Sequence, residues 1–355
     1  QINMVYSYPL LKKVFNYYYK KQVDISDLKL FSCQHLLAPQ YEMYKLLIEF
    51  GFTPENITVL GKIYSSNKGI IQDFQRLGIK CIQPEFRDMP FDEEHEFNCK
   101  KIAEEISDED INIILDDGGY LIYEARDKSV LFGVEQTSSG FRKLENIHLK
   151  FPVLNVARSK TKLVQESPII ARMILQRLKE YLSDTNIISP KVLIVGLGPI
   201  GNSLLKILTD EGVNVSGFDI ETTKELLISY LRTEKPDITI GATGAALFSE
   251  TDLDQLDNDH LYHFISVSSS DREFPVVPFR NNNQIHENIN YKNFVFVNNG
   301  FPINFKGNRY ESTPEEIEKT IALLMGSVMH GAVIGNGKSV GIVEVPEILE
   351  DLINN

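Results

Sequence analysis

Three glycines in the second half of the chain have a spacing that lets a polypeptide backbone approach a phosphate closely. Gly196, Gly198 and Gly201 form G-x-G-x-x-G directly after the apolar run Val192–Val195. In such a turn the first glycine permits a tight bend, the second leaves room for a pyrophosphate, and the third lets the next helix pack against the strand. The amides at the start of that helix then face the negative charge. The spacing therefore predicts a dinucleotide-binding turn.

The residues after the glycines continue the pattern of a strand–helix–strand unit. A helical stretch, Ser203–Asp210, precedes a strand-like run, Val213–Phe218, which ends at Asp219. An acidic residue about 20 positions after the glycines can bind the 2′-hydroxyl of a ribose, which favours NAD over NADP. We therefore predict NAD as the cofactor, although a glycine-rich turn without a ligand is the alternative. The expected cofactor-binding residues of this half are Gly196, Gly198, Pro199, Ile200, Gly201, Asp219 and Thr243.

Composition narrows the class of protein. A chain of 355 residues with 43% apolar content has enough material for two cores. The net charge of −13 argues against a nucleic-acid partner, because such partners require a basic surface. The apolar runs are too short to span a membrane, and the opening residues lack the apolar core of a signal peptide. We expect a cytoplasmic protein that binds a small molecule.

Three cysteines, Cys33, Cys81 and Cys99, are widely spaced and form no C-x-x-C pair. Such cysteines are typical of reduced intracellular thiols rather than of a disulfide framework. From their spacing along the chain we expect no metal site.

Strand-like and helical patterns alternate through the chain, which indicates parallel sheets covered by helices. We predict the class α/β, with two doubly wound parallel-sheet domains. The expected N-terminal substrate domain comprises residues 1–187 and 313–355, because the last helices are expected to return to it, and the expected Rossmann NAD-binding domain comprises residues 188–312. A loop is expected at residues 281–283.

Four motifs in the first half are specific as an ordered set. They are Asp116-Asp117-Gly118-Gly119, Glu135-Gln136-Thr137-Ser138-Ser139-Gly140, Pro152–Val156 and Thr161-Lys162. Together with the later G-L-G-P-I-G turn, this order resembles the S-adenosylhomocysteine hydrolase family over residues 28 to 305. In that family a bound NAD transiently oxidises the ribose 3′-hydroxyl of a nucleoside, so that a thiol can be eliminated and water added.

The resemblance implies a role for individual residues of this chain. Lys162 matches a lysine beside the 3′-hydroxyl, and Asp117 and His35 match acid–base positions near the leaving group. By the same resemblance Gln136, Glu166 and Thr137 contact the substrate, and Thr137, Ser138, Ser139 and Asn304 contact NAD. It also implies a homo-oligomer.

Each of these residues has a simpler structural interpretation. Lys162 and Glu166 are spaced as an ordinary i,i+4 pair on a helix surface. Asp117 could cap a turn, His35 could be a buried histidine with a satisfied hydrogen bond, and Thr137 to Ser139 could cap a helix.

The chain also departs from the family pattern at several positions. Ala157 replaces an asparagine, Ser268–Asp271 occupies the place of a histidine, and Lys306–Tyr310 replaces a second one. The last residues, Ile353–Asn355, show no counterpart of the family's C-terminal arm. Because loss of one general acid or base typically slows a reaction 10²–10⁴-fold, hydrolysis of adenosylhomocysteine is in doubt. Three functions stay open: an adenosylhomocysteinase-like enzyme acting on a nucleoside or related polar metabolite, an NAD-dependent dehydrogenase that releases NADH, and a non-catalytic relative that binds NAD or a nucleoside.

Overall fold

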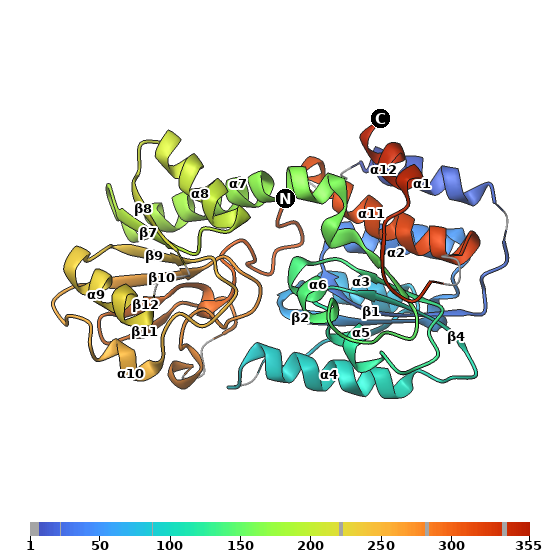
Figure 1. The fold of residues 1–355 in the computed structure, drawn as a ribbon, viewed down its shortest axis with the longest axis horizontal. Helices are drawn as coiled ribbons and strands as arrows, with labels where there is room; N and C mark the ends of the chain where they lie inside the picture. Colours follow the sequence, from blue (N-terminus) through green and yellow to red (C-terminus); the bar gives the residue numbers. More distant parts are fainter. Residues whose placement is uncertain (1–6, 22, 87, 220–222, 281–283, 336–338) are drawn as a thin grey trace. The chain divides into compact units, whose positions relative to one another are not determined.

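The computed structural model describes residues 7–21, 23–86, 88–219, 223–280, 284–335 and 339–355 (Figure 1). The chain divides into two compact units, the first formed by residues 1–85, 95–164 and 308–355, and the second by residues 86–94 and 165–307. The sequence-based division was placed at residue 187, whereas this division falls inside the long helix α7 (Lys160–Thr185). The loop expected at residues 281–283 lies outside the described residues.

The first unit is built on a seven-stranded sheet in the order β13-β6-β5-β4-β1-β2-β3. The strands are β1 (Leu28–Leu36), β2 (Ile57–Ser66), β3 (Lys80–Ile82), β4 (Ile111–Asp116), β5 (Phe132–Glu135), β6 (Pro152–Asn155) and β13 (Gly341–Glu344). All the neighbouring pairs of strands are parallel. The chain adds strands on one side of β1 and then on the other, so the strand order reverses between β1 and β4. Ligands of open α/β sheets bind beyond the carboxyl ends of the strands at such a switch point.

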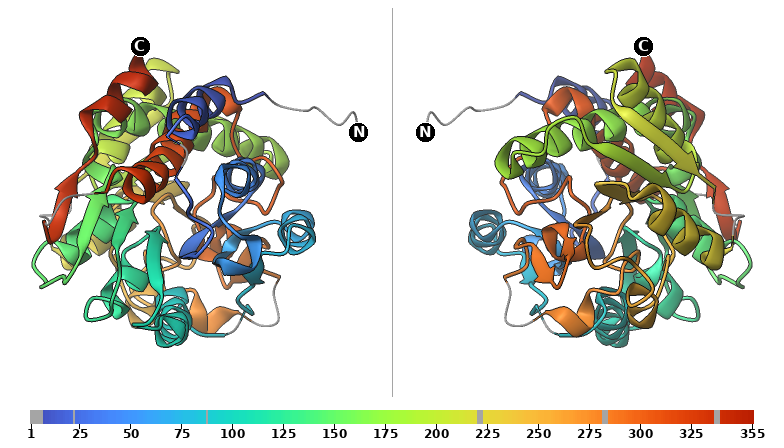
Figure 2. Two further views of the ribbon diagram at one scale, coloured as in Figure 1. Left: turned by 90° about the vertical axis from the view of Figure 1, so that its right-hand side faces the viewer. Right: turned by 90° about the vertical axis from the view of Figure 1, so that its left-hand side faces the viewer.

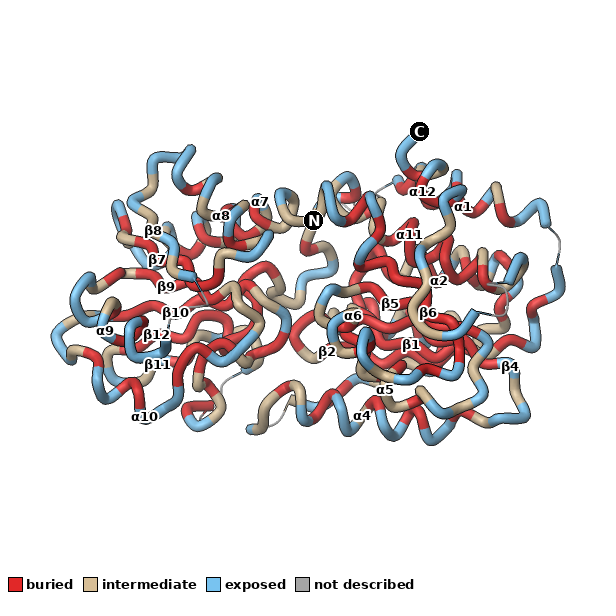
Figure 3. Tube along the Cα trace, viewed as in Figure 1, coloured by how far each residue is buried: buried red, intermediate tan, exposed pale blue. Residues whose placement is uncertain are grey.

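Helices cover both faces of this sheet (Figure 1). One face packs against α1 (Pro9–Tyr19), α2 (Ala38–Phe50), α3 (Lys68–Arg76), α11 (Pro314–Val333) and α12 (Glu347–Asn354), and the other against α4 (Phe91–Glu105), α5 (Tyr120–Glu124) and α6 (Ser138–Leu144). Alternate residues of β1 divide between the two layers: Leu30 joins the first, and Phe31 and Cys33 join the second. Because both faces are covered, the strands are nearly continuously buried (Figure 3).

Helix α1 packs beside the last two helices of the chain, α11 and α12, in the first unit (Figure 2, left). The Glu318 carboxylate of α11 accepts hydrogen bonds from the backbone amides of Leu10, at 2.6 Å, and Leu11, at 3.2 Å. These amides open α1 and have no partner within their own helix. Glu318, near the C-terminal end of the sequence, therefore provides a hydrogen-bond acceptor for the first amides of the N-terminal helix α1.

The second unit contains a six-stranded sheet in the order β11-β12-β10-β9-β7-β8. The strands are β7 (Lys191–Val195), β8 (Asn214–Phe218), β9 (Ile238–Gly241), β10 (Tyr262–Ser266), β11 (Ile289–Tyr291) and β12 (Phe294–Phe296). One face of this sheet packs against α7 and α8 (Pro199–Asp210), and the other packs against α9 (Lys224–Glu234) and α10 (Glu250–Leu253). The strands are parallel except for β11, which runs antiparallel to β12 at the edge. The switch point lies between β7 and β9.

The predicted fold class is confirmed, since each unit is a doubly wound α/β sheet. Among the described residues, no helix combines the length and apolar character that crossing a membrane requires.

Candidate functional site

Three charged or titratable side chains meet at the switch point of the first sheet. Asp117 is the residue after β4, Lys62 lies in β2 and His35 lies in β1. The Asp117 Oδ1 atom accepts a hydrogen bond from the Lys62 ammonium, and its Oδ2 atom lies 3.0 Å from His35 Nε2. The side chains of Lys62 and Asp117 are only 4% and 3% exposed. Three neighbouring strands thus bring one buried charged cluster together, which we call the β1/β4 cluster.

Burial and charge act in opposite directions on this cluster. Burial by itself raises the pKa of Asp117, but the positive charge of Lys62 and the contact with His35 lower that pKa below its usual range. For Lys62, burial lowers the pKa, whereas the Asp117 carboxylate raises it well above the usual value. Both partners therefore remain ionised at neutral pH, so Asp117 acts as a fixed negative charge.

The imidazole of His35 is held from both of its nitrogens. While Nε2 faces Asp117, Nδ1 lies 2.5 Å from the hydroxyl of Ser65, which follows Lys62 along β2. An ionised Asp117 accepts hydrogen bonds and cannot donate, so His35 donates from Nε2, and in the neutral imidazole Nδ1 accepts from Ser65. The cluster thus fixes both the orientation and the tautomer of His35. Lys62 and Ser65 were not identified from the sequence.

Two further carboxyl groups lie on the neighbouring strands β4 and β5. Asp116 and Glu135 are paired across these strands. Burial raises the pKa of Asp116 to about 7, and burial together with the negative charge of Asp116 raises the pKa of Glu135 well above its usual value. At neutral pH the protonated form is therefore favoured for Glu135, whereas Asp116, with a pKa of about 7, is present in both forms. They lie beside the β1/β4 cluster, where Asp117 has the opposite shift.

Glu135 connects the two glycine-containing motifs of the first unit. Its Oε1 atom accepts hydrogen bonds from the amide of Gly118, at 3.2 Å, and from the amide and hydroxyl of Thr137, at 2.7 and 2.8 Å. A Cβ atom at Gly140 would lie 2.1 Å from this carboxylate, so the position requires glycine. The D-D-G-G and E-Q-T-S-S-G segments are therefore held together by a buried acid.

The hydroxyl residues of the second motif take part in local bonds. Thr137 caps α6 by accepting from the amide of Gly140, at 3.0 Å, and its hydroxyl also lies 3.1 Å from that of Ser139. Ser138 is exposed. The capping interpretation thus describes Thr137, and a contact of these hydroxyls with NAD stays a prediction.

Lys162 is buried in the first turn of α7, which differs from the alternative of a surface pair. Its ammonium donates a hydrogen bond of 2.6 Å to the backbone oxygen of Gln136. The Gln136 side chain in turn accepts from the Gln34 amide, at 3.0 Å. Glu166 lies one turn further along α7 and is half-buried. The structure therefore brings together Lys162 and Gln136, which 26 positions separate.

Two amide side-chain oxygens at the carboxyl ends of the first sheet are buried and have no hydrogen-bond partner among the described residues. They are Oε1 of Gln34, in β1, and Oδ1 of Asn155, at the end of β6. Buried polar atoms are almost always hydrogen-bonded to protein or water. These two acceptors are therefore suited to the hydroxyl groups of a polar ligand.

The glycine turn of the second unit has the geometry that its sequence predicts. Gly196 has a φ of +99°, and a Cβ atom at Gly201 would lie 1.9 Å from the Gly196 carbonyl oxygen. Both positions thus require glycine for conformation or packing. At Gly198, by contrast, an added Cβ meets no atom within 4 Å, and α8 begins at the next residue. The open space at Gly198 lies at the amide end of this helix, as a pyrophosphate site requires.

The other predicted cofactor residues of the second unit lie at strand ends or in loops. Asp219 follows β8 and is exposed, and Thr243 follows β9 with its amide and hydroxyl hydrogen-bonded to Glu273, at 2.8 and 2.9 Å. Burial raises the pKa of Glu273. Asn304 is buried, and its Oδ1 atom has no hydrogen-bond partner among the described residues. These positions fit a dinucleotide, since an exposed acid and an unpaired amide oxygen suit its ribose and its carboxamide.

The segment that replaces the first expected histidine carries a buried ion pair. Arg280 donates to Asp271 at 2.5 Å and to the side chain of Asn299 at 2.7 Å, and both charged side chains are almost fully buried. Asp271 also accepts from the amide of Phe91, at 3.2 Å. This part of the second unit is thus occupied by structural ionic contacts in place of an imidazole.

The fold and these two strand-end sites define a doubly wound α/β protein with two sheets, one carrying buried charges and one a glycine turn. No protein-family model matches the chain. The chain is 30% identical to the uncharacterized proteins Rv0104 and MT0113 from two strains of Mycobacterium tuberculosis, over 93% of its own length and 70% of theirs. It belongs to the family of these proteins.

Several solved structures are more distantly similar. A D-lactate dehydrogenase from Sporolactobacillus is 10% identical, with a TM-score of 0.35, over 88% of this chain and 98% of that one. Dipicolinate synthase A chain from Bacillus subtilis is 11% identical, with a TM-score of 0.31, over 70% and 84%. A D-isomer-specific 2-hydroxyacid dehydrogenase from Lactobacillus delbrueckii is 12% identical, with a TM-score of 0.35, over 88% and 99%. These similarities are too distant to assign a ligand or a reaction, and none of these relatives is named as an adenosylhomocysteinase.

Proposed function

We propose that the protein is an NAD-dependent oxidoreductase that oxidises a hydroxyl group of a small polar metabolite. The observation that carries this proposal is the glycine turn at the β7/β9 switch point, where Gly196 and Gly201 are sterically required and Gly198 faces open space. In the proposal these backbone positions hold the pyrophosphate, Asp219 holds a ribose hydroxyl and Asn304 accepts from the carboxamide. When bound, NAD supplies a hydride acceptor.

In this proposal the first unit binds the metabolite at its own switch point. The unpaired oxygens of Gln34 and Asn155 accept hydrogen bonds from its hydroxyl groups. As the general base, Lys162 in its neutral amine form accepts the proton that an oxidised hydroxyl must release, and His35, oriented by Asp117 and Ser65, serves as a second proton carrier. Such a set suits a substrate with several hydroxyls, as in a nucleoside or a sugar acid.

A second candidate is an adenosylhomocysteinase-like reaction, in which the reduced cofactor is reoxidised within each turnover. One observation favours it: the residues that the resemblance implies, Lys162 with Gln136 and His35 with Asp117, form two contacts at the same edge of one sheet. The buried Asp271–Arg280 pair in place of a histidine counts against it. The dehydrogenase is therefore the main proposal.

The first test is calorimetric titration with NAD and with NADP, followed by substrate trials with adenosine, adenosylhomocysteine and 2-hydroxy acids. We expect NAD to bind more tightly than NADP, and Gly198→Val to abolish binding at unchanged stability. Accumulation of NADH with any of these compounds supports the dehydrogenase. NADH that appears only transiently, with release of a thiol, supports the second candidate. Absence of NAD binding would overturn both.

Lys162→Met tests the role of the first unit separately from cofactor binding. We expect the variant to bind NAD normally and to form no NADH. Lys160→Met is the matched control, because Lys160 is exposed and lies in the same turn of α7. Equal loss of activity in both variants would contradict the assigned role of Lys162.

A further inference from the structure

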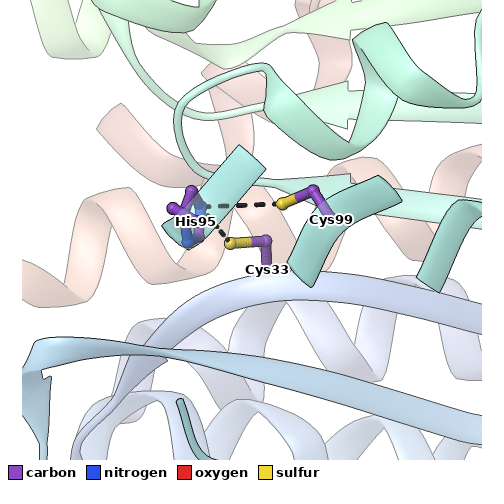
Figure 4. Close-up of side chains that lie close together, drawn as sticks. All are labelled: Cys33, His95 and Cys99. Atoms are coloured by element: carbon purple, nitrogen blue, oxygen red, sulfur yellow. Dashed lines mark hydrogen bonds between the residues drawn. The ribbon is translucent and has the colours of Figure 1, made fainter. Parts of the chain in front are cut away.

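Two cysteines and a histidine converge inside the first unit, on the sheet face that α4 covers (Figure 4). His95 and Cys99 lie one turn apart on α4, so their side chains project from the same side of the helix. Cys33 projects from β1 into the same layer. The three residues are 0–2% exposed, which places all of them in the interior. Their positions in the sequence are far apart, and the packing of α4 on the sheet joins them.

The three potential ligand atoms are separated by distances that suit one bound cation. The His95 Nε2 atom lies 3.1 Å from Cys33 Sγ and 3.7 Å from Cys99 Sγ, and the three atoms all lie within 4.8 Å of one another. In a tetrahedral zinc site, bonds of about 2.3 Å to sulfur and 2.1 Å to nitrogen place neighbouring ligand atoms roughly 3.5 to 3.8 Å apart. Small side-chain adjustments would therefore complete the coordination.

The chemistry of the set favours a soft divalent cation. Thiolates and imidazole are preferred ligands of zinc, whereas carboxylate and carbonyl oxygens are preferred by magnesium and calcium. Binding would release the two thiol protons, so that two thiolates balance the charge of Zn²⁺ and the imidazole stays neutral. A complex without net charge is suited to this interior, where the neighbouring side chains include the apolar Phe31 and Ile102 and the nearby charges of Lys62 and Asp117 already pair with each other.

We propose that Cys33, His95 and Cys99 form a zinc site that fastens α4 to β1. Three protein ligands leave one coordination position for water or another small ligand. Cys33 lies two residues before His35 in β1, so the two side chains point to the same face of the sheet. A metal bound to Cys33 would therefore hold the end of the strand that carries the β1/β4 cluster. This proposal replaces our expectation from sequence spacing that the cysteines bind no metal, and it is independent of the proposed enzymatic function.

The test uses the full chain, purified with reductant, stripped with a chelator and titrated with Zn²⁺ in competition with a chromophoric chelator. We expect one zinc per chain, and roughly 100-fold or greater loss of affinity in Cys99→Ser and in His95→Gln, since even outer-shell changes cost 10–100-fold. Cys81→Ser is the matched control, because Cys81 lies in β3 outside the cluster. Cobalt in place of zinc should give thiolate charge-transfer absorption in Cys81→Ser but not in Cys33→Ser.

Alkylation of the unsubstituted protein keeps the test valid if a variant fails to fold. Zinc should slow the modification of Cys33 and Cys99, mapped by mass spectrometry, and leave Cys81 unaffected. The proposal is overturned if the unsubstituted protein binds no zinc, if His95→Gln binds zinc as well as Cys81→Ser does, or if all three cysteines react equally with and without the metal. Binding of Cu(I) without Zn²⁺, or a Cys33–Cys99 disulfide in the purified protein, would also overturn it.

Discussion

The first unit presents charged side chains at the β1/β4 switch point, whereas the second presents bare backbone at the β7/β9 switch point. Lys62, His35 and Asp117 fill the first position with buried charge that is already paired. Gly196, Gly198 and Gly201 leave the second position without side chains, beside the amide end of α8. The same topology thus places buried charges at one switch point and an open glycine turn at the other.

The difference shows that topology specifies where a site lies and residue type specifies what it does. Parallel strands bring their carboxyl ends to one edge in both units. A buried charge is costly unless an opposite charge pairs with it, and this requirement explains the Lys62–Asp117 pair. In the second unit, backbone geometry explains two of the glycines, because Gly196 has a positive φ and Gly201 lies against the Gly196 carbonyl.

The largest expected effect comes from breaking the charge balance of the first unit. Lys62→Met should destabilise the protein by about 3–5 kcal/mol, because it leaves the buried Asp117 carboxylate without its main partner. Urea unfolding measures this effect. Lys29→Met is the control, since the Lys29–Asp110 pair is about one-third exposed and should contribute about 0–1 kcal/mol. Similar losses in the two variants would refute the special role of the Lys62–Asp117 pair.

In the second unit, two glycines that look equivalent in the sequence should behave differently. Gly201→Ala should cost about 3 kcal/mol, because its Cβ would collide with the Gly196 carbonyl oxygen. Gly198→Ala should change stability by less than about 0.5 kcal/mol, because its Cβ meets nothing within 4 Å. Urea unfolding compares the two variants. A stability loss in Gly198→Ala equal to that in Gly201→Ala would show that the space at Gly198 is filled by protein.

The pH dependence of stability distinguishes two acidic groups at the carboxyl end of β4: Asp116, its last residue, and Asp117, which follows directly. Asp116 has a pKa of about 7 in the folded protein and near 4 when unfolded, so the folded state holds the extra proton between these values. The contribution of Asp116 to stability therefore decreases as pH rises from about 4 to about 7. Relative to the unsubstituted protein, Asp116→Asn should gain stability over this interval, as followed by urea midpoints.

The contribution of Asp117 to stability changes with pH in the opposite direction, because folding lowers the pKa of this group. Its contribution is fully present above the unfolded pKa near 4 and is lost as pH falls below that value. Asp117→Asn should therefore be less stable than the unsubstituted protein at neutral pH. This difference in the free energy of unfolding should shrink as the solution is acidified. The same pH trend in both variants would contradict the assignment of opposite shifts.

The smallest expected effect concerns Thr137, which the resemblance assigns to NAD and the structure shows as a helix cap. Thr137→Ala should cost about 1 kcal/mol of stability through loss of the cap on α6, and Thr137→Ser should retain it. Thermal unfolding measures the change in stability that loss of the cap causes. Titration of the same variants with NAD measures whether the predicted cofactor contact contributes to NAD affinity. NAD affinity that is equal in all three proteins would leave Thr137 with the structural role alone.

Local patterns in the sequence were sufficient for most of the regular elements. The apolar runs at residues 28–33 and 111–115 lie in β1 and β4, and the helical pattern at residues 161–182 lies in α7. The sequence pattern does not predict the strands β5 and β13. Each of these has four residues and one glycine, so neither shows a clear period. Helix α1 was also missed, since its role depends on packing against α11.

Three kinds of feature can be recognised from the amino-acid sequence: the glycine turn, the alternation of strands and helices, and the motifs that contain Asp117, Gln136 and Lys162. These features depend on neighbours in the chain, whose spacing can be read directly. The tertiary structure alone decided that Lys62 pairs with Asp117, that Ser65 orients His35, and that Cys33 meets His95 and Cys99. The physical reason is that these contacts join different strands and helices, and the order of strands in a sheet is fixed by packing of the whole unit.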